Sequence, residues 1–223
     1  MSAPRLLETM RAEGGRVALL DRHLDRLAAS AAALGYALDA DAVREVVETE
    51  ARAADGARGV RLTLGPAGDV EAASWALDDA PFRTAWVDPE PFLDAGTWRC
   101  VHKTTARGAY RERWGRAQAH GADEAVLVNA RGEVAEGTRT SVWARVDGRW
   151  WTPPLDAGGL AGVMRAHVLA TDPLAGERTL TPADLRAAEA VALSNALRGW
   201  MPVEVVGRSD GSRGSSESDE VAG

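Results

Sequence analysis

The sequence has few of the residues and segments that mark several common classes of protein. It has one cysteine, Cys100, so the chain cannot close an intramolecular disulfide, and its four histidines show no metal-ligand spacing with Cys100 or with each other. We therefore expect no bound metal. No apolar run approaches the roughly 18 residues of a membrane span, and residues 1–5 form no apolar signal region. These absences predict a cytoplasmic protein.

Positive charge is also in the minority. The chain of 223 residues has 26 Lys+Arg against 33 Asp+Glu, a formal net charge of -7. Binding to nucleic acid without sequence preference needs a basic face that displaces counterions, so this balance argues against that class of protein. The hydrophobic share of 45% and the charged share of 26% are ordinary for a globular protein, which excludes a fully disordered chain.

Lysine is the residue whose scarcity is most informative. The 26 basic residues are 25 arginines and a single lysine, Lys103. Lysine and arginine do similar work in solvent, but only lysine readily loses its proton and forms a Schiff base. A lone lysine in an arginine-rich chain is either a surface residue left by chance or one kept for its chemistry. Lys103 is therefore a candidate catalytic residue.

Hydrophobic periodicity and turn signals predict an α/β protein in two parts. The N-terminal domain, residues 1–88, is predicted to hold a hairpin over 6–20, helices over 21–35 and 41–54, and strands over 60–64, 70–77 and 83–87. We expect Asp21 to cap the first helix and Gly35 to end it. Residues 89–97 predict an interdomain linker. The second domain, residues 98–206, is predicted to hold helices over 108–120 and from about 162, and strands over 125–128, 142–146, 149–152, 191–193 and 203–206. The polar residues 207–223 predict a disordered tail.

Three features together suggest a cofactor site. Residues 158–165 form a glycine-rich turn that runs into an apolar helix start, where free backbone N–H groups favour a phosphate, although a plain tight loop has the same pattern. Glu136 lies just past a predicted hairpin strand, beside Gly137, either in a cleft or in solvent. A lone lysine, an isolated carboxylate and a phosphate-binding helix start are the groups that pyridoxal phosphate requires. The fingerprints of nucleotide-binding loops and of serine hydrolases are absent from the sequence.

Seven stretches of the chain resemble the class IV (fold type IV) aminotransferase family in content and order. They are residues 7–11, 20–27, 102–107, 121–129, 132–138, 153–155 and 159–165. Within that family, residues 194–203 are similar to the aminodeoxychorismate lyases, with Asn195 and Leu197 where transaminases usually have Gly-Thr or Thr-Thr. The resemblance spans residues 6–206 and is more specific than any one of its motifs.

The resemblance implies a fold, a cofactor and a set of site residues. The implied fold is a small N-terminal α/β domain and a larger C-terminal β-barrel-like domain with helices, with pyridoxal 5'-phosphate in the cleft between them and a homodimer as the assembly. The implied cofactor contacts are Lys103 as Schiff-base lysine and proton-transferring base, Glu136 at the pyridine nitrogen, Arg26 at the phosphate, and the backbone of Val163, Met164 and Ala196 around the phosphate. The implied substrate contacts are Asn195, Arg198, Thr9 and Arg107.

The activity implied is a lyase that converts 4-amino-4-deoxychorismate to 4-aminobenzoate, a folate precursor, and pyruvate. Two alternatives stay open: a class IV aminotransferase acting on branched-chain or D-amino acids, and a non-catalytic homologue with an incomplete N-terminal domain. The second alternative arises because family members carry a further strand and turn before residues 7–11. The tyrosine that transaminases place shortly after the lysine is not at its usual spacing here; Tyr110 comes later and is not expected to reach the cofactor. For Arg26, an ion pair with the acidic neighbours of Arg22 is the alternative to a phosphate contact.

Overall fold

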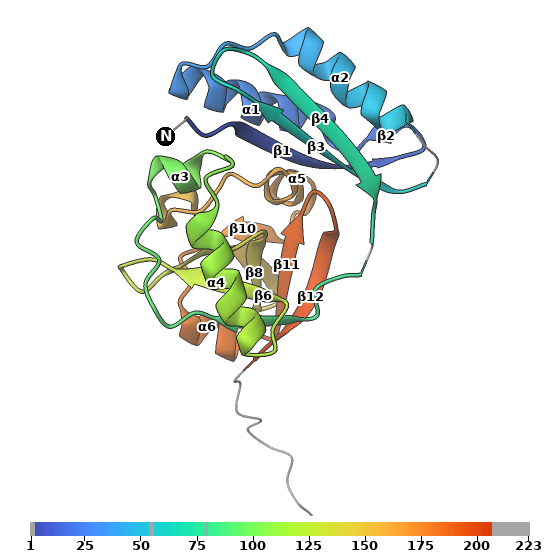
Figure 1. Ribbon diagram of the computed structural model, residues 1–223. Coiled ribbons are helices and arrows are strands. Elements are labelled where there is room, and N and C mark those ends of the chain that lie inside the picture. Colours follow the sequence, from blue (N-terminus) through green and yellow to red (C-terminus); the bar gives the residue numbers. More distant parts are fainter. Residues whose placement is uncertain (1–2, 54–55, 79, 207–223) are drawn as a thin grey trace, which may run out of the picture.

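Residues 6–76 form a four-stranded antiparallel sheet with two helices on one face (Figure 1). The strands, in spatial order, are β2 (Arg16–Val17), β1 (Leu6–Glu13), β3 (Arg58–Leu64) and β4 (Val70–Ala76). The computed structural model describes residues 3–53, 56–78 and 80–206, so the predicted tail at 207–223 lies outside the described residues. The hairpin predicted around the two adjacent glycines is confirmed as β1 and β2.

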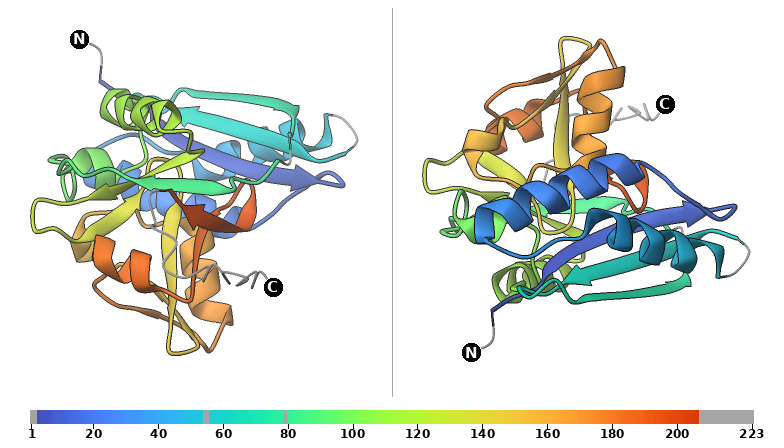
Figure 2. Two further views of the ribbon diagram at one scale, coloured as in Figure 1. Left: turned by 90° about the horizontal axis from the view of Figure 1, so that it is seen from below. Right: turned by 90° about the horizontal axis from the view of Figure 1, so that it is seen from above.

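Two amphipathic helices cover the sheet on the side seen from above (Figure 2, right). They are α1 (Leu20–Leu34) and α2 (Ala40–Arg52). Asp39 caps α2, because its side chain accepts a hydrogen bond from the backbone N–H of Ala42 at 3.0 Å. The apolar stripes of both helices pack on the sheet and form the hydrophobic core of this unit with residues such as Val47, Val60 and Leu62.

The start of α1 differs from our prediction and its end agrees with it. Leu19 occupies the N-cap position with φ 56° and gives no side-chain cap, so Asp21 is not the cap. The tight exit from β2 shifts the start of the helix, and Asp21 lies in the first turn, paired with Arg44 at 2.7 Å. Gly35 ends the helix at φ 71°, a left-handed conformation that glycine adopts without steric cost.

One position of β1 breaks the apolar pattern of its core-facing side. Successive side chains of a strand point to opposite faces, so Leu6, Glu8 and Met10 share the face beneath α1. Leu6 and Met10 are each 1% exposed and belong to the core, and Glu8 between them is 2% exposed. Leu7 and Thr9 point the other way, toward the second unit. A carboxylate therefore lies inside an otherwise apolar layer.

The second unit is a curled, mixed sheet of eight strands. In spatial order these are β10 (Ala175–Glu177), β9 (Arg149–Thr152), β8 (Ser141–Val146), β11 (Ala190–Asn195), β12 (Gly199–Val205), β5 (Thr84–Val87), β6 (Glu124–Val128) and β7 (Val134–Gly137). The last strand, β7, also contacts β8, so the sheet curls back toward itself. This confirms the predicted α/β class and the β-rich second part.

Helices and one 3-10 turn surround this sheet (Figure 1). They are α3 (Trp98–Val101), α4 (Gly108–Ala119), η1 (Leu155–Ala157), α5 (Val163–Thr171) and α6 (Pro182–Ala187). The predictions of α4 and α5 are confirmed. We did not predict α3, α6 or β10, because the two helices are too short to show a helical period and β10 contains no β-branched or aromatic residue. Within the described ranges, no helix combines the length and the apolarity that a bilayer crossing requires.

The predicted boundary between the domains is wrong. Strand β5, which we assigned to the N-terminal domain, pairs in parallel with both β12 and β6 of the second sheet. The predicted linker at 89–97 is also part of the second unit, because Phe92 is 3% exposed and its ring centroid lies 5.1 Å from that of Tyr110. The strands that pair with β5 lie far from it in sequence, so the local sequence pattern does not show to which sheet β5 belongs.

A buried carboxylate fixes the chain where β5 ends. Asp88 is fully buried and pairs with Arg113 at 3.0 Å and with Arg116 at 3.2 Å. Asp88→Asn is expected to lower the free energy of unfolding by about 2 kcal/mol, because both arginines lose a charged partner. Urea unfolding measures this. Glu90→Gln is the control, since Glu90 contacts the same arginines from solvent, and an equal loss there would contradict the role of burial.

Candidate active site

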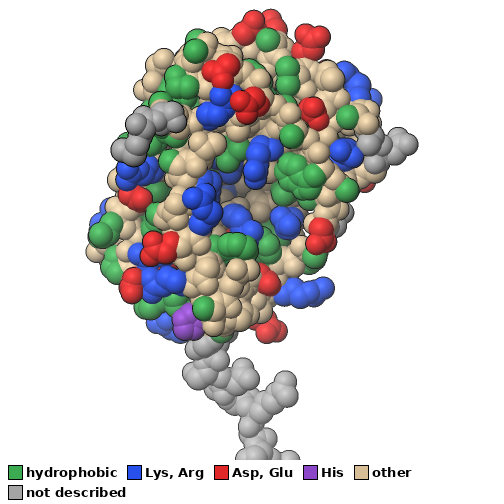
Figure 3. Space-filling model, viewed as in Figure 1, with side chains coloured by type: hydrophobic (Ala, Val, Ile, Leu, Met, Phe, Trp, Pro, Cys, Tyr) green, Lys and Arg blue, Asp and Glu red, His purple; other side chains and the backbone are tan. Residues whose placement is uncertain are grey.

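A cavity of about 280 Å³ lies between the first sheet and the second. Figure 3 shows it as a hollow in the molecular face, with basic side chains gathered around it. All ten predicted site residues line this cavity: Thr9, Arg26, Lys103, Arg107, Glu136, Val163, Met164, Asn195, Ala196 and Arg198. Residues from widely separated stretches of sequence therefore meet in one place. Their individual roles remain predictions.

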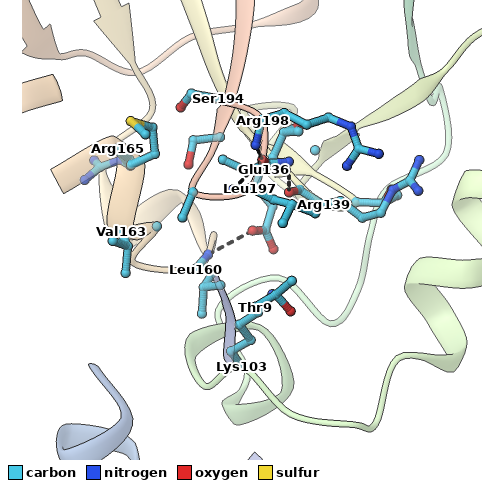
Figure 4. Close-up of a pocket in the computed structure, with 18 of the residues that line it drawn as sticks. Thr9, Lys103, Glu136, Arg139, Leu160, Val163, Arg165, Ser194, Leu197 and Arg198 are labelled. Atoms are coloured by element: carbon cyan, nitrogen blue, oxygen red, sulfur yellow. Dashed lines mark hydrogen bonds between the residues drawn. The ribbon is translucent and has the colours of Figure 1, made fainter. Parts of the chain in front are cut away.

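Lys103 lies on a segment that is hydrogen-bonded to β1. The backbone N–H of Leu7 donates to the carbonyl of Lys103, and that of Thr105 donates to the carbonyl of Arg5, each at 2.9 Å. Figure 4 shows Lys103 and Thr9 on one side of the cavity and Glu136 on the other. The Lys103 ammonium makes no hydrogen bond or ion pair with any residue that the structure describes. The first unit thus fixes the position of a lysine that belongs to the second.

The surroundings of Lys103 favour its neutral amine. Burial in the cavity wall, followed by repulsion from the cations of Arg107 and Arg26, lowers the pKa of Lys103 to about 7. Glu8 and Glu136 oppose this shift without cancelling it. A large share of the molecules therefore carries a free amine at neutral pH, which is the nucleophilic form.

This pKa gives a direct prediction, since the chain has one lysine. Reductive methylation with formaldehyde, followed by mass spectrometry, reports only Lys103 and the N-terminal amine. Because only the neutral amine reacts, the rate at Lys103 is expected to rise about tenfold per pH unit below pH 7 and to level off above it. A rate that still climbs between pH 8 and 10 would show an ordinary lysine and contradict the prediction.

Glu136 is buried within β7, whereas we had predicted that it lies just past the strand. One carboxylate oxygen accepts the backbone N–H of Leu160 at 3.1 Å (Figure 4) and the other accepts the hydroxyl of Tyr110 at 2.5 Å. Burial raises the pKa of Glu136, and those two donors, together with the cations of Arg107 and Lys103, act against the rise. The carboxylate is thus oriented by two fixed donors in the cavity wall.

Tyr110 is closer to the site than its spacing from Lys103 suggested. Its side chain is buried and its hydroxyl donates to Glu136. The guanidinium of Arg107 lies 4.0 Å from the centre of its ring. Arg107 and Tyr110 lie at the start of α4, so the orientation of that helix decides both contacts of Tyr110. The spacing between Lys103 and Tyr110 along the chain does not show this orientation.

The start of α5 presents unbonded backbone amides to the cavity. Among the residues that the structure describes, the N–H groups of Val163, Met164 and Ala196 make no hydrogen bond, and Gly162 at the N-cap gives no side-chain cap. A Cβ atom at Gly162 would lie 2.6 Å from Oγ of Ser141, so only glycine fits there without a shift. Free amides at a helix start suit a phosphate or another anion.

Arg26 reaches this amide cluster from α1. Its guanidinium donates to the carbonyl of Ala161 at 3.0 Å, and to both carboxylate oxygens of Glu8 at 2.9 and 2.6 Å. The alternative that Arg26 pairs with the acidic neighbours of Arg22 is wrong. Those neighbours sit on the solvent side of the helix, whereas Arg26 points across β1 toward the cavity.

The side chain of Asn195, which lines the cavity, is hydrogen-bonded to the loop that follows it. Its Oδ1 accepts the N–H groups of Leu197 at 3.1 Å and Arg198 at 2.8 Å, and its Nδ2 donates to the carbonyl of Arg139 at 3.3 Å. These bonds occupy the side-chain oxygen and one amide hydrogen. Asn195 thus positions the loop that carries Ala196 and Arg198, and its contact with a substrate stays a prediction.

Basic side chains dominate the lining, although the chain as a whole is acidic. Among the described residues, the lining holds one acidic residue, Glu136, and seven basic ones: Arg26, Arg61, Lys103, Arg107, Arg139, Arg165 and Arg198. Arg26 pairs with Glu8, and Arg165 pairs with Glu177. The four other arginines of the lining, Arg61, Arg107, Arg139 and Arg198, form no ion pair with any described residue. Such an excess of positive charge attracts an anionic ligand.

Two of these unpaired arginines lie together on Phe82. Arg139 and Arg198 approach its ring to 4.7 and 5.1 Å, and within the described part of the chain they donate only to backbone carbonyls, those of Asp123 and Ala80, at 3.2 Å each. Burial, in the first place, lowers the pKa of Arg139, and repulsion from Arg198 adds to the shift. Sequence reasoning missed Arg139, since one arginine among 25 gives no signal.

Fold and cavity together define an α/β enzyme with its site between two units, and comparison with known proteins gives the family. The family model described as Amino-transferase class IV matches residues 5–206. A Schizosaccharomyces pombe protein provisionally named an aminodeoxychorismate lyase is 34% identical over 174 residues, 76% of this chain and 74% of that protein. The chain therefore belongs to the class IV aminotransferase family, which confirms the resemblance.

Solved structures agree with this assignment. The crystal structure of a Mesorhizobium loti protein, provisionally named an amino-acid aminotransferase, is 36% identical with a TM-score of 0.84, and the match covers 92% of this chain and 100% of that one. The branched-chain aminotransferase of Thermoproteus uzoniensis is 25% identical with a TM-score of 0.79, covering 92% of this chain and 79% of that one. The fold is that of fold type IV enzymes.

Proposed function

We propose that this protein is a pyridoxal-phosphate-dependent 4-amino-4-deoxychorismate lyase that forms 4-aminobenzoate and pyruvate. The observation that carries the proposal is the cavity lining, which combines a lysine of pKa about 7 with four arginines that lack an ion-pair partner among the described residues. The proposed substrate has one amine and two carboxylates, which match these groups. The similarity of residues 194–203 to lyases and the name of the yeast relative support the same reaction.

The residues present fit pyridoxal phosphate. The free amides at the start of α5, the amide of Ala196 and the guanidinium of Arg26 would hold the phosphate. Glu136, with its two fixed donors, would hold the pyridine nitrogen, and Lys103 would bond the aldehyde carbon. When bound, the cofactor supplies an electron sink for the carbon that loses a proton.

The residues of the chain then account for the proton transfers. The amine of Lys103 would take the proton from the ring carbon that carries the substrate amine. The bond from the ring to the enolpyruvyl oxygen breaks, the ring becomes aromatic, and the leaving group takes up one proton to become pyruvate. One proton leaves and one returns, so no water and no acceptor acid is consumed. Arg107, Arg139 and Arg198 would hold the carboxylates.

An aminotransferase is the second candidate, because the Mesorhizobium loti structure matches along its whole length and carries that name. A branched-chain amino acid would leave most of the unpaired arginines without a partner, so the charge of the lining argues against that substrate. A non-catalytic homologue fits least. A buried lysine whose pKa is lowered is typical of a reactive group and does not stabilise the fold.

One assay separates these candidates. The purified protein is mixed with pyridoxal phosphate and aminodeoxychorismate with no keto acid present, and pyruvate is followed with lactate dehydrogenase and NADH. A lyase releases pyruvate over many turnovers. Transfer of the amino group to an added keto acid, without pyruvate release from aminodeoxychorismate, would establish the aminotransferase, and neither activity would leave the non-catalytic homologue.

We also propose a homodimer, as the family resemblance implies, and a location in the cytoplasm. Light scattering after size-exclusion chromatography measures the mass against the 23.6 kDa of one chain. A monomer at the concentration used in the activity assay would contradict the proposed assembly.

A further inference from the structure

Three charged or polar side chains form a cluster inside the apolar layer between β1 and α1. Glu8 from β1 is 2% exposed, and the side chain of His23 from α1 is fully buried. His23 Nδ1 lies 2.7 Å from Oε2 of Glu8, and Arg26 binds both oxygens of the same carboxylate. The neighbours of Glu8 on this face are the core residues Leu6 and Met10.

The protonation states in this cluster follow from its contacts. Burial alone would raise the pKa of Glu8, but Arg26 and His23 outweigh it and hold the pKa at about 2, so Glu8 is an anion. An ionised carboxylate only accepts hydrogen bonds, and His23 Nδ1 therefore carries the hydrogen. Nε2 of His23 is buried and has no partner among the described residues. Burying this cluster therefore costs hydration free energy, both for the ion pair and for the unpaired nitrogen.

Stability by itself is a poor explanation for such a cluster. A buried ion pair loses its hydration, and well-packed apolar residues of similar volume are often as stable or more stable. The face of β1 is apolar on both sides of Glu8, so leucine-like residues would suit the layer. The part of the cluster that leaves the core is the guanidinium of Arg26, which lines the cavity.

We propose that Glu8 and His23 are positioning residues that hold Arg26 in place as the phosphate contact of the cavity. Glu8 takes two of the five N–H donors of the guanidinium and the carbonyl of Ala161 takes a third. Two donors are left for a ligand beside the free amides of α5. His23 fixes the carboxylate that fixes the arginine. This inference rests on the proposed use of pyridoxal phosphate.

The cluster also links the phosphate site to the lysine. Glu8 holds Arg26 through its side chain, and the adjacent Leu7 holds the Lys103 segment through its backbone N–H at 2.9 Å. Arg26 of the first unit and Lys103 of the second, the two groups that would bind the opposite ends of the cofactor, are thus both positioned by neighbouring residues of β1. A change at Glu8 is expected to affect the phosphate end and to leave the lysine end in place.

The test compares pyridoxal phosphate with pyridoxal, which lacks the phosphate, as ligands of the cofactor-free protein. Dissociation constants are read from the yellow absorption band in wild type, Glu8→Gln and Glu8→Asp. Both variants are expected to bind pyridoxal phosphate about 10- to 100-fold more weakly and to bind pyridoxal as wild type does. If Glu8 only lowered the local charge, Glu8→Gln would strengthen the binding of pyridoxal phosphate and Glu8→Asp would leave it unchanged, which would overturn the proposal.

His23 is tested with a matched pair of variants. His23→Asn keeps a donor near the place of Nδ1, and His23→Leu removes it. The leucine variant is expected to lose several-fold in affinity for pyridoxal phosphate alone, and the asparagine variant is expected to stay close to wild type. Equal affinity in wild type and His23→Leu would remove His23 from the proposal.

Asp88→Asn is the control for a loss of stability without a change at the site. Asp88, like Glu8, is a buried carboxylate that pairs with arginine: Asp88 pairs with two arginines and Glu8 with one. Unlike the Arg26 that Glu8 binds, neither Asp88 nor its two arginines are among the residues that line the cavity. If Asp88→Asn weakened the binding of pyridoxal phosphate as much as Glu8→Gln, at equal loss of thermal stability, the effect would be general and the proposal would fall. A wild type that forms no yellow band would overturn both this inference and the proposed cofactor, whereas equal binding by all Glu8 variants would overturn this inference alone.

Discussion

Lys103→Met is expected to abolish the yellow band formed with pyridoxal phosphate and to lower kcat for pyruvate release by about 10³-fold or more. The variant loses both the amine that bonds the aldehyde and the base that moves the proton. No second lysine exists in the chain to replace it. Absorption spectra and the coupled pyruvate assay measure the two effects on the same samples.

The same substitution is expected to stabilise the protein in the absence of cofactor. The pKa of Lys103 is about 7 in the folded chain and near its ordinary 10.5 when unfolded, so between these values the unfolded state binds more protons. Wild-type stability therefore rises with pH from about 7 to about 10.5, and is reduced at and below pH 7. Methionine has no charge to desolvate, and we expect a gain on the order of 2 kcal/mol at pH 7 that shrinks toward pH 10.

The control for this prediction is Lys103→Arg. Arginine keeps a cation at the position but neither loses its proton nor forms the covalent bond, so turnover and colour are expected to be lost as in the methionine variant. Thermal unfolding at pH 7 and pH 10 supplies the stability comparison. Retained turnover in Lys103→Arg would show that charge alone is needed and would contradict the role given to Lys103.

Glu136→Gln is expected to lower kcat by about 10²-fold or more while the protein still forms the yellow band. A glutamine accepts the hydroxyl of Tyr110 as the glutamate does, but it has no charge to keep a pyridine nitrogen protonated. The loss therefore falls on proton removal from the substrate and not on covalent capture of the cofactor. Steady-state kinetics and a titration with pyridoxal phosphate separate the two.

Tyr110→Phe is the matched control for the Glu136 prediction. It removes the 2.5 Å hydrogen bond to Glu136 but keeps the carboxyl group and the ring that Arg107 packs on. We expect a much smaller decrease in kcat than in Glu136→Gln. Equal activity of Glu136→Gln and wild type would mean that Glu136 does not control the reaction, whatever the effect of Tyr110→Phe.

The sequence identified the residues whose chemistry or scarcity makes them recognisable along the chain. Lys103 is distinguished by being the only lysine, and the start of α5 by its glycines. The helices α1 and α2 follow from their hydrophobic period, and Gly35 as an end signal needs only local conformation. These features depend on a residue and its near neighbours in sequence, so reading the chain was sufficient.

Other features depend on which distant residues meet. The sequence predicted β5 as a strand, but only its parallel neighbours place it in the second sheet. The sequence marked Asn195 only as a candidate substrate contact, and the structure adds its hydrogen bonds with Leu197, Arg198 and Arg139, which hold a loop in place. Tyr110 reaches Glu136 because of the register of α4, which no spacing rule supplies.

The charged cluster at Glu8 shows the same division. Its residues lie in stretches that the sequence assigned correctly to a strand and a helix, yet nothing in those stretches indicates that a carboxylate faces the core. Hydrophobic period and rare residues are properties of the local chain and determine elements and candidate chemistry. Burial, hydrogen-bond partners and pKa values depend on the water that neighbouring elements exclude and on the charges that they bring near, and only the tertiary structure decides those.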